Sequence, residues 1–104
     1  MIITTTENIA GRQIKEVIGV VRGNTIRARH IGRDIMAGLK TIVGGEIKSY
    51  TEMISKARDE AIARMKSDAE KLGADAIVMV RFTTADVLPQ AAEVLAYGTA
   101  VKLE

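Results

Sequence analysis

The residues best suited to holding a metal ion are a histidine and an aspartate four positions apart. His30 is the sole histidine, and Asp34 follows it at a spacing that puts both side chains on one face of a helix. A metal site needs three or four ligands, and soft heavy metals favour cysteine and histidine. Because the chain has no cysteine, His30 and Asp34 form an incomplete set, and we expect no metal site within one chain.

Basic side chains gather between positions 22 and 33, where they could contact phosphate groups or nucleic acid. The members are Arg22, Arg27, Arg29, His30 and Arg33. No aromatic residue interleaves with them to stack on bases, and charged runs commonly form solvated faces. We therefore expect a surface or subunit-interface patch, with phosphate or nucleic-acid binding as an alternative.

A pair of glycines at positions 44–45 precedes Glu46 and invites comparison with a phosphate-binding loop. The spacing of the known phosphate and dinucleotide motifs is absent, and a carboxylate beside phosphate has the wrong sign. A tight turn between helices is the better interpretation. Glu46 and Tyr50, together with Arg27 and Arg29, are instead candidates for lining a small-ligand cleft at a boundary between subunits.

Nucleophilic catalysis has no support in the residue inventory. Ser49, Ser55 and Ser67 all fall in or at one long helical segment, and none occupies a strand-to-helix elbow. With one histidine and no cysteine, the common catalytic triads lack their members. We therefore expect no enzymatic activity, no catalytic residue and no cofactor.

Composition indicates one soluble domain spanning residues 1–104. Hydrophobic residues make up 47% of the chain and aromatic residues 3%, so the core must be aliphatic and modest. The formal net charge of +2 does not mark a nucleic-acid or membrane-surface protein. No apolar run is long enough to cross a bilayer, and no signal peptide is seen. We expect a cytoplasmic protein without a membrane partner.

The elements that would position these residues form an α+β domain. Residues 2–3 suggest a short strand, and 13–22 a longer one that ends at a turn, Gly23-Asn24, before a return strand at 25–29. Residues 31–43 and 49–72 have helical periodicity. Residues 76–84 and 93–103 are strand-like, with a connection around Pro89 between them. These elements predict a three-stranded, mostly antiparallel sheet with the long helix on one face.

Several segments in this order resemble the YbjQ-like family of small bacterial proteins, which is often labelled heavy-metal-binding. They are MIITTT at the start, GLKTIVGGE at 38–46, Tyr50, LGADAIVMVRF at 72–82 and YGTAV at 97–101. The resemblance covers the whole chain. It implies a dodecin-subunit-like β-α-β-β fold, ring-shaped homopentamers and no established activity. We thus expect a non-enzymatic homo-oligomer that binds a small ligand at subunit boundaries, with heavy-metal binding as an alternative.

Overall fold

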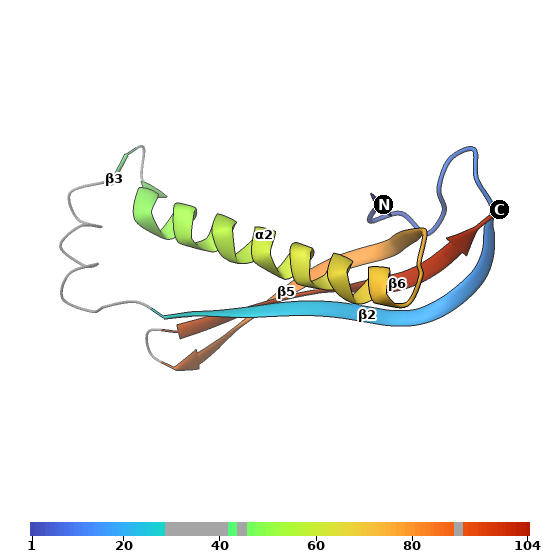
Figure 1. Cartoon of the computed structure of the whole chain (residues 1–104). Coiled ribbons are helices and arrows are strands. Elements are labelled where there is room, and N and C mark those ends of the chain that lie inside the picture. The colour runs from blue at the N-terminus through green and yellow to red at the C-terminus, as the bar shows by residue number, and fades with distance from the viewer. Residues whose placement is uncertain (29–41, 44–45, 89–90) are drawn as a thin grey trace.

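A four-stranded mixed sheet with a long helix across one face forms the described part of the chain (Figure 1). The computed structural model describes residues 1–28, 42–43, 46–88 and 91–104. The strand order in the sheet is β1-β5-β6-β2. This arrangement confirms the α+β class, but the sheet has one strand more than predicted, because β1 (Ile2–Ile3) adds to β5 in parallel. The dodecin-type comparison stays a prediction.

Strand β2 runs unbroken over Ile14–Ala28. The turn predicted at Gly23-Asn24 is therefore wrong, and so is the separate return strand at 25–29. Gly23 is buried beneath the helix, where a Cβ atom would lie 2.2 Å from the Met65 nitrogen and 2.3 Å from the Ala61 oxygen. The glycine thus serves close approach of helix and strand rather than a change of chain direction.

Helix α2 spans Lys48–Lys71, within one residue of the predicted segment at each end. The small side chains on its apolar face are fully covered: Ala57, Ala61 and Ala69 are at most 1% exposed. Met65 lies on the same face and is also completely buried. The helix lies mainly over β2 and to a lesser extent over β6. The predicted packing of this face on the sheet is confirmed, with β2 as its principal partner.

Strands β5 (Ala76–Leu88) and β6 (Ala91–Leu103) form a long antiparallel ribbon. The connection predicted around Pro89 is shorter than expected, because β5 continues to Leu88 and β6 already begins at Ala91. A bulge between Val78 and Arg81 places Met79 at φ 56, a left-handed conformation. The bulge lies against Gly98, where a Cβ would approach the Ile77 Cγ2 atom to 2.8 Å.

The helix predicted at 31–43 is also wrong over its last two residues. Ile42–Val43 is a short strand, β3, which pairs with β4 (Glu46–Ile47). Most of that predicted helix, residues 31–41, and the glycine pair at 44–45 lie outside the described residues. The strands on either side of positions 44–45 correct the interpretation of a helix–helix turn.

Alternating residues of the ribbon build two apolar clusters on opposite faces of the sheet. The larger cluster lies under α2 and includes Val21, Ile77 and Val94. The smaller cluster, around Val101, is partly covered by Ile9 from the N-terminal segment. That segment is tied to β5 by main-chain hydrogen bonds through Thr4 and Thr6. Both termini consequently lie at the same end of the molecule (Figure 1).

No helix among the described residues is long and apolar enough to cross a membrane.

Candidate functional site

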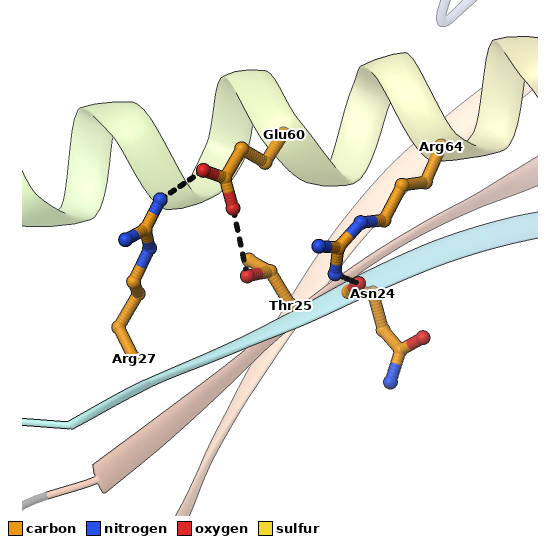
Figure 2. Close-up of polar contacts among 5 residues, drawn as sticks. All are labelled: Asn24, Thr25, Arg27, Glu60 and Arg64. Atoms are coloured by element: carbon orange, nitrogen blue, oxygen red, sulfur yellow. Dashed lines mark hydrogen bonds and ion pairs between the residues drawn. The ribbon is translucent and has the colours of Figure 1, made fainter.

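Polar side chains from β2 and α2 meet beside the buried helix–strand contact (Figure 2). Glu60 accepts a hydrogen bond from the hydroxyl of Thr25 at 3.0 Å and forms an ion pair with Arg27. Thr25 is 4% exposed, so its hydroxyl depends on this carboxylate for a partner. Glu60 and Arg27 therefore connect helix α2 to strand β2, and we call this pair with Thr25 the polar clip.

Arg27, a predicted ligand contact, borders a shallow pocket of about 270 Å³ that also includes Glu52, Met53 and Lys56. Its guanidinium is already engaged by Glu60, and its Nε atom is buried without a hydrogen-bond partner among the described residues. An arginine held in this way has fewer donors left for a ligand. In the described structure Arg27 holds strand β2 to helix α2, and its role in ligand binding stays a prediction.

The structure places two of the other predicted ligand residues by their backbones only. Glu46 belongs to β4 and Tyr50 to the first turn of α2. Arg29, His30 and Asp34 lie outside the described residues. Within the described ranges, no group of three His, Cys, Asp or Glu side chains has metal-binding geometry.

The described members of the basic patch lie on opposite faces of the sheet. Arg27 shares the helix-covered face with Thr25, whereas Arg22 stands opposite Tyr97 on the other face. Alternation along a strand separates side chains at odd and even positions. Arg22 and Arg27 therefore do not form one continuous surface, and Arg33 lies outside the described residues.

A second pocket, which sequence reasoning missed, lies where the edge of β2 meets the last turns of α2. We call it the strand-edge pocket; its volume is about 360 Å³. Its lining residues are Arg22, Gly23, Asn24, Arg64, Ser67, Asp68 and Lys71. The sequence did contain a signal, because positions 64, 67, 68 and 71 recur at steps that share one helix face.

Two helix side chains form hydrogen bonds with the main chain of β2 at this pocket. The Arg64 Nη1 atom donates to the Asn24 carbonyl oxygen at 2.5 Å (Figure 2), and the Arg22 amide donates to the Asp68 Oδ2 atom at 3.5 Å. β2 is an edge strand of the described sheet. Such edges invite pairing with other strands unless they are covered. Arg64 and Asp68 therefore protect the middle of this edge.

Fold and site together define a small α+β protein whose long helix is fastened along an edge strand. The family described as "Putative heavy-metal-binding" matches residues 1–104. A protein from Archaeoglobus fulgidus is 62% identical over 103 residues, covering 99% of this chain and 95% of the relative. One from Thermotoga maritima is 57% identical over 104 residues, covering 100% and 98%. Both are named "UPF0145 protein". The chain belongs to the YbjQ-like family, as its motifs predicted.

A solved structure supports the same fold. It is a protein of unknown function from Pediococcus pentosaceus, described as a member of the DUF74 family. Its TM-score is 0.72 at 26% identity, and the match covers 100% of this chain and 98% of that one. The family description points to metal binding, and none of the other names assigns an activity.

Proposed function

We propose that this chain is a cytoplasmic, non-enzymatic subunit of a ring-like homo-oligomer that binds a small ligand at its subunit boundaries. The observation that carries the proposal is the extended form of the chain. Its radius of gyration is 17.0 Å, whereas a compact domain of this length has about 13 Å. A chain drawn out in this way leaves surfaces that a second copy would cover.

The accessible surface supports the same conclusion. It amounts to 6954 Å², whereas a compact monomer of 11.2 kDa exposes about 5,700 Å². A standard interface removes roughly 800 Å² from each partner. The excess is therefore of the size that association with neighbouring subunits would bury.

Exposed apolar residues indicate where neighbours would bind. On β2, Val17 is 65% exposed, Val20 75% and Ile26 57%. The outer edge of β5 is also open beyond Val80, because the main-chain hydrogen bonds from the N-terminal segment extend only to that residue within the described chain. An open strand edge and an apolar face in different parts of one subunit favour heterologous contacts, which close into rings.

The number of subunits rests on the family resemblance, which implies a pentamer. The boundary ligand rests on Glu46, Tyr50, Arg27 and Arg29. Its support is the open pocket beside Arg27, which lies near the helix start. Native mass spectrometry of the assembly, purified without added ligand, should show mass above that of the bare chains. Tyr50→Ala should abolish this excess, and an unchanged excess in that variant would contradict the boundary site.

Light scattering after size-exclusion chromatography tests the assembly. We expect a mass of five times the 11.2 kDa chain. Val20→Glu should shift it toward the monomer, because a carboxylate in an apolar interface must lose its hydration. Leu72→Glu is the matched control, since Leu72 is also exposed, at 51%, but lies beyond the helix end. A single-chain mass at every concentration would refute association, and a dimer would refute the ring.

A further inference from the structure

Two cationic side chains of one helix line the strand-edge pocket. Arg64 and Lys71 come from the last two turns of α2, whereas Arg22 borders the pocket through its main chain, because its side chain belongs to the opposite face of the sheet. The lining contains one carboxylate, Asp68, whose Oδ2 atom faces the Arg22 amide. Two positive charges against one negative charge give the pocket a net attraction for anions. This excess also opposes the partial negative charge at the C-terminal end of the helix.

Arg64 is already fixed in position before any ligand arrives. One of its donors is used by the Asn24 carbonyl oxygen, and a guanidinium has five N–H donors in a fixed plane. A ligand would therefore meet an arginine that has lost much of its side-chain freedom, which lowers the cost of binding. Gly23 contributes indirectly, because its missing side chain lets the helix bring Arg64 to the strand.

The Lys71 ammonium binds no other side chain among the described residues, and Ser67 adds a hydroxyl to the lining. Arginine matches the paired oxygens of a phosphate, while lysine supplies a point charge. The volume of about 360 Å³ lies in the range of small-molecule sites, about 300–1,000 Å³. The lining contains no aromatic side chain on which a nucleic-acid base could stack.

We infer that the strand-edge pocket binds the phosphate group of a small molecule, with Arg64 and Lys71 as its anion contacts. The pocket is complete within one chain, so the inference does not depend on the proposed assembly or on its boundary ligand. It also differs from the basic patch predicted at positions 22–33, with which it shares Arg22.

Backbone amide NMR of the full chain tests this inference. Titration with inorganic phosphate and with glycerol 3-phosphate should give saturable shifts at residues 22–24 and 64–71, while glycerol gives none. Arg64→Gln and Lys71→Gln should each weaken binding about tenfold, the value of one charge-assisted hydrogen bond. Arg58→Gln and Lys66→Gln are matched controls, because both lie on α2 outside the pocket lining. They should leave the affinity within about twofold.

A further variant should change the affinity for phosphate in the opposite direction. Asp68→Asn keeps an oxygen for the Arg22 amide but removes the carboxylate charge, so it should tighten phosphate binding several-fold. Thermal melts of each variant separate lost binding from lost folding. Absence of saturable binding to the folded wild-type protein would overturn the inference. Equal weakening in pocket and control variants would also overturn it, as would a single-stranded oligonucleotide that binds more tightly than glycerol 3-phosphate.

Discussion

Substituting Gly23 with alanine should strongly destabilise the protein, because the helix backbone lies directly over this position. The added Cβ would meet the Met65 nitrogen at 2.2 Å, the Ala61 oxygen at 2.3 Å and the Arg64 carbonyl carbon at 2.8 Å. Unbonded heavy atoms rest at about 3.5–4.0 Å. The helix would therefore have to rise from β2 by on the order of 1 Å over the centre of its contact.

The size of the effect follows from which atoms collide. Overpacking a core commonly costs about 1–3 kcal/mol when side chains can rotate away. Here all three colliding atoms belong to the main chain, so no rotation relieves the contact. Raising the helix would also loosen Ala57, Ala61 and Met65, which are buried against the sheet. We expect a loss of about 3 kcal/mol or more, which is a large part of the ~5–15 kcal/mol typical of a domain.

Urea unfolding followed by circular dichroism, at one fixed protein concentration, measures this loss. Gly19→Ala is the matched control on the same strand: φ at Gly19 is 152°, and no atom lies within 4 Å of the added Cβ. It reports the cost of backbone conformation alone, about 1–2 kcal/mol. In the Gly23→Ala background, Met65→Ala should not restore stability, because the clash involves the Met65 backbone. A Gly23→Ala protein within 0.5 kcal/mol of wild type would refute the reasoning.

Two further predictions address the polar clip and the metal label. Glu60→Gln keeps an oxygen for the Thr25 hydroxyl but removes the ion pair with Arg27, so the free energy of unfolding should fall by about 1 kcal/mol or less. Added salt should reduce the stability difference between this variant and the wild type, because salt screens the ion pair. A larger loss in urea titrations that does not depend on salt would contradict this. Isothermal titration calorimetry with Cu, Zn and Cd should show no stoichiometric complex of sub-micromolar affinity, because the chain has one histidine and no cysteine. A complex of that affinity that is lost in His30→Ala would overturn this expectation.

Sequence periodicity was sufficient to predict the long helix α2 and the strands β5 and β6. The apolar stripe runs along the length of α2, and β-branched residues are frequent in β5, so local pattern and tertiary environment agree. Glycine was misread because it has two uses that look alike in sequence. Gly23 was interpreted as a turn, whereas its value lies in what packs above it. Contacts between distant segments decide that, and no local window contains them.

The candidate site was predicted less well, for a related reason. Arg27 was selected because it belongs to a basic run, yet its nearest partner, Glu60, lies on a different element. The strand-edge pocket is lined by Arg22 of β2 and Lys71 of α2, and no local pattern in the sequence indicates that these two residues lie close together. Charge patterns along a chain show which residues share a helix face, but they do not show which strand edge that face will meet.

The pairing of the chain's two ends has a consequence for how the protein is made. Ile14 on β2 faces Leu103 on β6, and Ile2 on β1 faces Ala76 on β5. During synthesis on the ribosome, β2 must therefore wait for almost the whole chain before its strand partner emerges. Helix α2 is completed earlier and already covers Val21 and Gly23. We expect this helix–strand unit to shield β2 in the nascent chain, and strand closure to be the slow final step.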